Sequence, residues 1–136
     1  MKEIWTWIQT AFAAIGGLLG WYLGGLDGFL YALIAFVVVD YITGVLRAIV
    51  EKKLSSRIGA HGIAKKVAIF LVVGIGHLID TYLIGGTGAP LRTAVIFFYI
   101  ANEGVSLLEN ATAIGLPVPD KLKDALAQLH GKDGDA

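Results

Sequence analysis

The chain has 136 residues, about one domain by the usual length expectation. Its hydrophobic fraction of 56% and charged fraction of 16% depart from a soluble domain, which is about 45–50% apolar and about 25% charged. Eleven basic residues balance eleven acidic ones and there is no cysteine, so a basic nucleic-acid-binding domain, a disulfide framework and a thiolate metal site are excluded, and a membrane protein is indicated.

Four apolar segments approach the length of about 20 residues that a helix needs to cross a bilayer. They are Ile4 to Gly24, Phe29 to Val50, Val67 to Ile84 and Leu91 to Leu108. Short glycine-rich turns separate the first from the second and the third from the fourth. The sequence therefore predicts an all-α membrane protein with about four transmembrane helices. The first segment is rich in glycine and bracketed by tryptophans, so it either spans the membrane or lies in its plane.

The last apolar segment ends before Pro117 and Pro119, which do not continue a helix. Beyond them, apolar residues recur at the spacing of one helix face and predict a short amphipathic helix over 120–130. These residues are Leu122, Ala125, Leu126 and Leu129. We therefore divide the chain into a transmembrane helical domain, residues 1–116, and a cytoplasmic tail, residues 117–136.

Basic residues gather in the connection expected between the second and third segments. They are Lys52, Lys53, Arg57, Lys65 and Lys66. Arg92 is the lone basic residue near either glycine-rich turn. Because cytoplasmic loops carry an excess of lysine and arginine, this pattern places the 51–66 loop and both termini on the cytoplasmic side of the membrane. The loop is expected to set orientation and to contact anionic lipid.

Ionisable residues inside the predicted spans are expensive, at about 2.5–3.5 kcal/mol each when charged at mid-helix. They fall on polar stripes along three of the predicted helices. The stripes are Asp40, Thr43 and Arg47; His77 and Asp80; and Asn102, Glu103, Ser106, Glu109 and Asn110. Two interpretations remain open: a closed bundle that satisfies these groups internally, or protomers whose stripes meet at a lumen when copies assemble.

Small residues repeat in the first segment, where Gly16, Gly20 and Gly24 are spaced by four. This spacing lets helix backbones approach closely and is compatible with self-association. Enzyme chemistry is not expected, because no serine lies close to His77 in sequence and the glycine-rich stretch 59–62 lacks the order of a phosphate loop. We expect neither a metal nor a cofactor.

Several segments in a fixed order resemble the phage holin family that includes the clostridial toxin-secretion holins. They are Asp40–Gly44, Ser55–Lys66 with Gly59 and Gly62, His77–Asp80, Tyr99–Asn110 and Gly115–Pro119. The likeness covers roughly residues 15–130. The extreme amino end and the aspartate-containing tail depart from it.

This resemblance implies a holin, a protein that oligomerises in the cytoplasmic membrane and opens lesions at a set time. The lesions release a cell-wall hydrolase or a toxin, with no direct contact to that cargo required. We hypothesise that Asp40, Asp80 and Glu103 are sequestered in the resting state and face a lumen after assembly. His77 is interpreted as a packing residue or a proton-sensitive partner of Asp80. The alternative function is a small multispan transporter or channel subunit with buried carboxylates.

Overall fold

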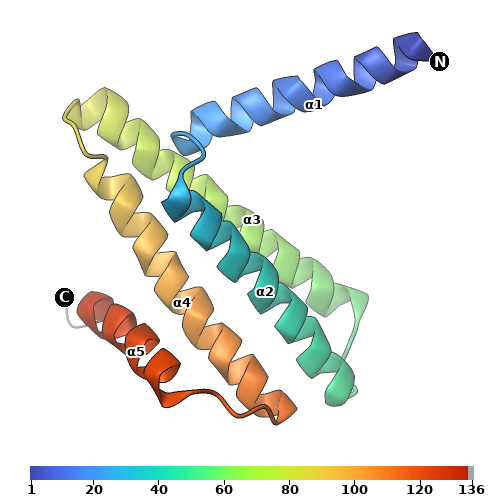
Figure 1. The fold of residues 1–136 in the computed structure, drawn as a ribbon, viewed down its shortest axis with the longest axis vertical. Helices are drawn as coiled ribbons and strands as arrows, with labels where there is room; N and C mark the ends of the chain where they lie inside the picture. The colour runs from blue at the N-terminus through green and yellow to red at the C-terminus, as the bar shows by residue number, and fades with distance from the viewer. Residues whose placement is uncertain (135–136) are drawn as a thin grey trace.

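The computed structural model describes residues 1–134, and side-chain surroundings for residues 1–128. Within them the chain is helical, with five α-helices and a π-helical segment, η1 (Figure 1). The elements are α1 (Lys2–Leu23), α2 (Gly28–Val50), α3 (Ser56–Leu78), η1 (Ile79–Ile84), α4 (Pro90–Ile114) and α5 (Asp120–Gly134). η1 continues α3 directly, so the two form one long helical segment.

The helix ends follow local sequence signals. Asp27 and Ser55 begin α2 and α3, and the side chain of each accepts a hydrogen bond from a backbone N–H in the first turn. Pro90 stands first in α4. Gly24 ends α1 with φ at 85°, a left-handed conformation that favours glycine. A Cβ at Gly24 would also meet the side chains of His77 and Arg92, so the turn into α2 is both strained and crowded for any other residue.

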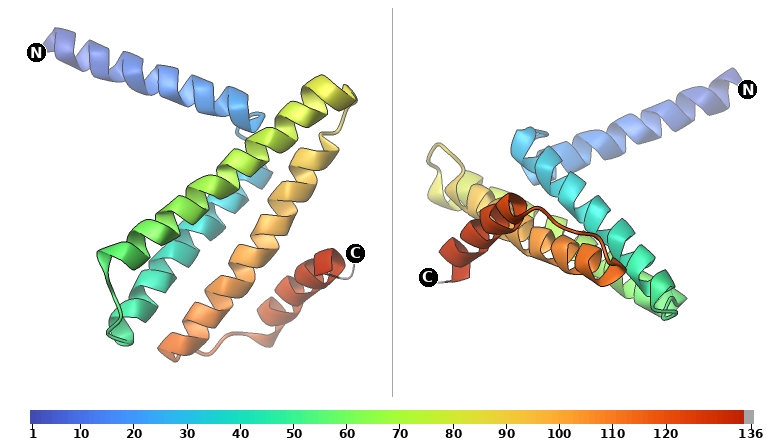
Figure 2. Two further views of the ribbon diagram at one scale, coloured as in Figure 1. Left: turned by 180° about the vertical axis from the view of Figure 1, so that it is seen from behind. Right: turned by 60° about the horizontal axis from the view of Figure 1, so that its bottom comes forward.

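α2, α3 with η1, and α4 lie side by side as an up-and-down bundle (Figures 1 and 2). The buried core of this bundle is aliphatic: Leu23, Leu30, Leu33, Val37, Ile69, Val73, Ile96 and Ile100. Its outward side chains are also apolar, as Ile42, Leu71 and Phe98 illustrate. A helix that is hydrophobic on every side is typical of a membrane-spanning helix rather than of a helix exposed to water.

Among the described residues, three helical segments are long and apolar enough to cross a membrane: Gly28–Val50, Ser56–Ile84 and Pro90–Ile114. They correspond to the second, third and fourth predicted spans. The first predicted span is not among them. Instead, α1 joins the bundle at the end where η1 connects to α4, and its N-terminal part points away from the bundle (Figure 1).

The predicted 51–66 loop is shorter than expected, because α3 already begins at Ser56. Arg57, Lys65 and Lys66 are therefore helical residues, and only Lys52 and Lys53 of the basic group lie in the connection. The prediction placed the helix start at the beginning of the apolar run, but the Ser55 cap lies a dozen residues earlier. This correction moves Lys66 into the bundle.

The tail helix α5 folds back beside α4 (Figure 2). Leu126 is its buried residue, 3% exposed, and lies against Gly104. The amphipathic helix predicted over 120–130 is therefore present, and it continues to Gly134. The side chain of Leu129, the last residue of the predicted apolar face, lies outside the described surroundings.

Replacing Gly74 with alanine should weaken the attachment of α1 to the bundle. A Cβ at Gly74 would lie 1.8 Å from the ring of Tyr22, whose hydroxyl donates a hydrogen bond to the Leu71 carbonyl over 2.7 Å. Overpacking of this kind costs about 1–3 kcal/mol. Thermal unfolding in detergent should show the loss, whereas Ala68→Gly, an exposed position on the same helix, controls for the change of helix propensity. Equal midpoints for Gly74→Ala and wild type would contradict this packing.

Candidate functional site

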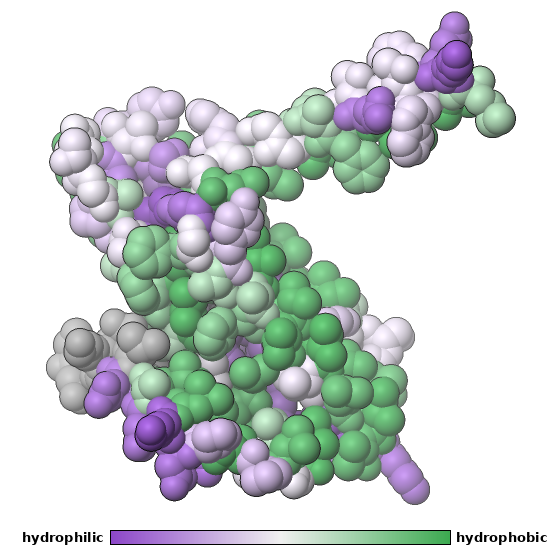
Figure 3. Space-filling model, viewed as in Figure 1, coloured by the Kyte–Doolittle hydropathy of each residue, from purple (hydrophilic) through white to green (hydrophobic). Residues whose placement is uncertain are grey.

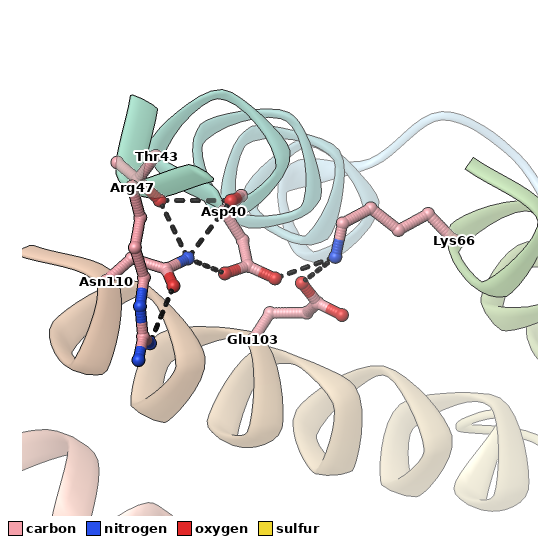
Figure 4. Close-up of polar contacts among 6 residues, drawn as sticks. All are labelled: Asp40, Thr43, Arg47, Lys66, Glu103 and Asn110. Atoms are coloured by element: carbon pink, nitrogen blue, oxygen red, sulfur yellow. Dashed lines mark hydrogen bonds and ion pairs between the residues drawn. The ribbon is translucent and has the colours of Figure 1, made fainter. Parts of the chain in front are cut away.

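A buried ion cluster joins the three bundle helices near the middle of their length (Figure 4). The Lys66 ammonium of α3 donates to Asp40 Oδ2 of α2 and to Glu103 Oε2 of α4, each over 2.7 Å. Both carboxylate side chains are only 6% exposed and that of Lys66 is 14% exposed. One ammonium thus holds two carboxylates from two different helices, away from lipid.

Asn110 extends this cluster toward the end of the bundle where α2 meets α3. Its amide donates to Asp40 Oδ1 over 3.0 Å and to the Thr43 hydroxyl over 3.2 Å, and its carbonyl oxygen accepts from Arg47 over 3.5 Å. Arg47 also pairs with Glu51 on its own helix at 3.1 Å. The predicted stripe of α2 therefore binds the stripe of α4 directly. We call these six residues, Asp40, Thr43, Arg47, Lys66, Glu103 and Asn110, the central cluster.

Two cavities flank the ion pairs. One, of about 210 Å³, runs from the cluster toward Leu54 and Ile58 between α2 and α3. The other, of about 300 Å³, lies between α3 and α4 and is lined by Tyr99 and Asn102. Ser106, Asp40 and Lys66 line both cavities. Polar side chains of the ion pairs thus border two cavities that are otherwise lined largely by apolar side chains.

A second polar cluster lies at the opposite end of the bundle, beside the base of α1. Arg92, 4% exposed, donates to the carbonyl oxygens of Leu23 and Gly25 over 2.6 and 2.9 Å, and to Asp27 over 2.8 Å. Asp80 accepts the backbone N–H groups of Leu91 and Arg92 over 3.0 and 2.8 Å. We call Arg92, Asp27 and Asp80 the hairpin clamp, because they tie the α1–α2 turn and η1 to the first turn of α4.

The predicted residues thus separate into different places. Asp40, Thr43, Arg47, Glu103 and Asn110 meet in the central cluster, and Ser106 and Asn102 line its cavities. Asp80 does not join them, and its carboxylate caps α4 rather than pairing with His77. His77 instead lies 3.4 Å from the Thr81 hydroxyl, and Glu109 is exposed beside a third cavity. A Cβ placed on Gly16 or Gly20 would meet no atom within 4 Å, whereas one on Gly24 would meet His77 and Arg92.

Sequence reasoning assigned Lys66 to the loop and gave Arg92 and Asp27 no role. The sequence does contain a pattern that indicates burial of Lys66 and Arg92. Lys66 falls on the same helix face as Ile69, Val73 and Asp80, and Arg92 on the same face as Ile96, Ile100 and Glu103. Both faces are the buried ones. If the helical periodicity of the apolar residues had been extended to the two basic residues, both would have been predicted to lie inside the bundle.

The pH dependence of the hairpin clamp follows from Asp27, which lies in the turn outside the membrane-spanning segments. The hydrogen bond from the Arg92 guanidinium lowers the pKa of Asp27 below its ordinary value of 3.8. A lowered pKa stabilises the fold above the unfolded-state pKa, and this contribution is lost as pH falls through the folded-state value. Because Asp27 is half exposed, we expect an effect of only about 0.2–1 kcal/mol.

Thermal unfolding in detergent at pH 7 and pH 3 measures this effect in the wild type and in Asp27→Asn. Asparagine still caps α2 but cannot titrate, so the variant should lose less stability on acidification. An equal loss in both proteins would mean that Asp27 makes no such contribution.

The fold and the central cluster define a small helical membrane protein with an ion cluster buried between its spans. The family model of the bacteriophage holin family matches residues 17–131. The chain therefore belongs to the bacteriophage holin family.

Relatives of the chain match it over most of its length. A probable holin of Bacillus phage phi105 is 38% identical over 105 residues, 77% of this chain and 76% of its own. An uncharacterized 14.9 kDa protein in the nagH 3′ region of Clostridium perfringens is 42% identical over 97% of this chain and 99% of its own. An uncharacterized Listeria monocytogenes protein is 44% identical over 94% of this chain and 90% of its own. No solved structure matches the chain.

Proposed function

We propose that this protein is a holin that assembles with copies of itself in the bacterial cytoplasmic membrane and opens lesions there. Family membership and the likeness to the probable phage holin support the activity. The observation that carries the mechanism is the buried central cluster. A membrane protein with no polar function has no reason to bury two carboxylates, a lysine and an asparagine among aliphatic helices, since each is expensive there.

The mechanism follows from how the central cluster is held. Lys66 is the one basic group between two carboxyl groups, so the cluster brings two acidic side chains and a single ammonium together inside the bundle. This arrangement is tolerable while the helices stay packed. If the helices of neighbouring protomers separate and pack against one another instead, Asp40, Glu103 and Lys66 face a shared aqueous lumen. Hydration of these three side chains by the water in the lumen then stabilises the open state.

The partners of this mechanism are other copies of the chain and lipid. The cargo is a cell-wall hydrolase or a toxin, which passes through the lesion without binding to the protein. Lys52 and Lys53 lie exposed in the connection between α2 and α3, and with Arg57 they favour a cytoplasmic location of that end. Nucleic acid is not a partner of a chain without net charge.

Co-expression with a cell-wall hydrolase that has no export signal tests this function. Induction of both proteins should lyse the cells abruptly, whereas either protein alone should leave the wall intact. Retention of the hydrolase in the cytoplasm of cells with normal amounts of the membrane protein would contradict holin activity.

A transporter is the second candidate, and the two cavities on either side of the ion pairs favour it. In this function the pair of Lys66 with Asp40 and Glu103 would gate a path for one solute or ion. Flux in reconstituted vesicles separates the two functions. A transporter should show saturable uptake of one solute, whereas a holin should release dyes and proteins of many kinds without saturation.

A further inference from the structure

α1 has a surface that no part of the protomer covers. It contacts the bundle through its last turn, where Leu23 is its buried residue and Tyr22 reaches Leu71. Nine other large apolar side chains of α1 are between 42% and 74% exposed. They are Ile4, Trp5, Trp7, Ile8, Phe12, Ile15, Leu18, Leu19 and Trp21. A surface of this size in water would be an aggregation liability, so it has an occupant.

The two sides of α1 differ in chemistry. At 3.6 residues per turn, the large apolar residues from Ile4 to Leu19 fall on about half of the circumference, with Trp21 at its edge. The opposite half carries small and polar residues: Lys2, Thr6, Gln9, Ala13, Gly16, Gly17 and Gly20. No atom lies within 4 Å of where a Cβ would stand on any of these three glycines. The small and polar half is therefore open, and α1 is amphipathic rather than apolar on all sides.

The direction of the apolar half is fixed by Tyr22. This residue follows Ile4, Ile15 and Leu18 by 18, 7 and 4 positions, so all four share one line along the helix. The Tyr22 hydroxyl donates to the carbonyl of Leu71, and its ring lies over Gly74. Leu71 lies thirteen residues before Ile84, where η1 ends. Along the helical segment of α3 and η1, the distance between these two residues is about 20 Å.

The line of Ile4, Ile15 and Leu18 therefore faces the depth at which the spans are apolar, and the glycine half faces the opposite way. Figure 3 shows hydrophobic residues along the edge of α1 nearer to the apolar belt of the bundle. The apolar half of α1 is thus continuous with the outward surface of the spans, which lipid covers. The same lipid would cover both.

We infer that α1 lies in the plane of the membrane surface, with its apolar half on the acyl chains of one leaflet and its glycine half in water. The chain then crosses the bilayer three times. α1 lies at the end of the bundle that carries the hairpin clamp, so it and the basic connection between α2 and α3 lie on opposite sides of the membrane. This inference rests on the spans being in a bilayer and is independent of the holin activity.

The absence of cysteine from the natural sequence makes adjacent labelling positions a direct test. Phe12→Cys and Ala13→Cys lie side by side in sequence but on opposite halves of α1. In intact cells, before any loss of membrane potential, a membrane-impermeant maleimide should label Ala13→Cys at least tenfold faster than Phe12→Cys. Protection of both indicates a span, labelling of both indicates a helix projecting into water, and the reversed order indicates that the glycine half packs on protein. Each of these outcomes overturns the inference.

Depth measurements provide a second readout that does not depend on labelling. All three tryptophans of the chain are in α1, so Trp5, Trp7 and Trp21 can be changed to phenylalanine and a single Phe12→Trp introduced. In vesicles of brominated phosphatidylcholine with phosphatidylglycerol, bromines near the headgroup end of the acyl chain should quench this variant most. Strongest quenching by bromines near the bilayer centre would place position 12 at mid-membrane. That result would identify α1 as a fourth span and overturn the inference.

Discussion

Replacing Lys66 with methionine is expected to lower the free energy of unfolding by about 3–5 kcal/mol. The methionine side chain keeps most of the apolar stem of lysine but leaves Asp40 and Glu103 facing each other without the ammonium that each contacts at 2.7 Å. An uncompensated buried charge is the costly product of breaking such a pair. Unfolding of the purified protein in detergent, followed by circular dichroism, measures the loss. In cells, the variant should accumulate poorly.

Two further variants separate the charge from the packing. Lys65→Met removes an exposed lysine one residue away and should leave stability within about 0.5 kcal/mol of the wild type. A triple variant, Lys66→Met with Asp40→Asn and Glu103→Gln, removes all three charges and should regain most of the stability. If Lys66→Met alone is as stable as Lys65→Met, the ion cluster does not hold the bundle together.

Replacing Arg92 with methionine is the second change for which a large loss is expected, about 2–3 kcal/mol. The guanidinium donates to two carbonyl oxygens of the α1–α2 turn and to Asp27, and methionine would leave the buried carbonyl of Leu23 without this donor. The hairpin clamp would open and free the base of α1.

The tryptophans report this local effect, because all three belong to α1 and Trp21 lies at its base. In Arg92→Met, the tryptophan fluorescence should change at a lower temperature, or at a lower concentration of denaturing detergent, than the circular dichroism of the bundle. Arg57→Met removes an exposed arginine and serves as the control. Simultaneous changes in both signals, at wild-type stress, would contradict a clamp at Arg92.

Much of this architecture was predictable from local sequence. Runs of apolar residues predicted the four long helices, and glycine-rich turns predicted two of the three connections between them. The spacing of Asp40, Thr43 and Arg47 predicted a polar stripe that packs against another helix, as it does against Asn110. These features depend on residues within one or two helical turns, and such patterns are the strongest signals in a single sequence.

The pairing between helices was not predictable in the same way. Lys66 lies 26 residues from Asp40 and 37 from Glu103, and nothing local indicates which carboxylate a lysine will meet. The clustering of basic residues assigned it to a loop together with Lys52, Lys53 and Arg57. Asp80 similarly was grouped with Asp40 by residue type, although it lies at the other end of the bundle.

The α1 segment illustrates a different limit. Its overall hydrophobicity is near that of a span, and its glycines resemble the packing positions of membrane helices. The distribution around the helix and the contact of Tyr22 with Leu71 indicate which side faces lipid. Amphipathicity decides between a span and an interfacial helix only when the direction of the apolar half is known.

The collapse of membrane potential after induced expression tests the central claim, holin activity, most directly. A voltage-sensitive dye should report a stable potential through a lag while the protein accumulates, followed by an abrupt collapse whose time is the same from culture to culture. A gradual decline that begins with expression and grows in proportion to the amount of protein, or a potential that never falls, would contradict the account.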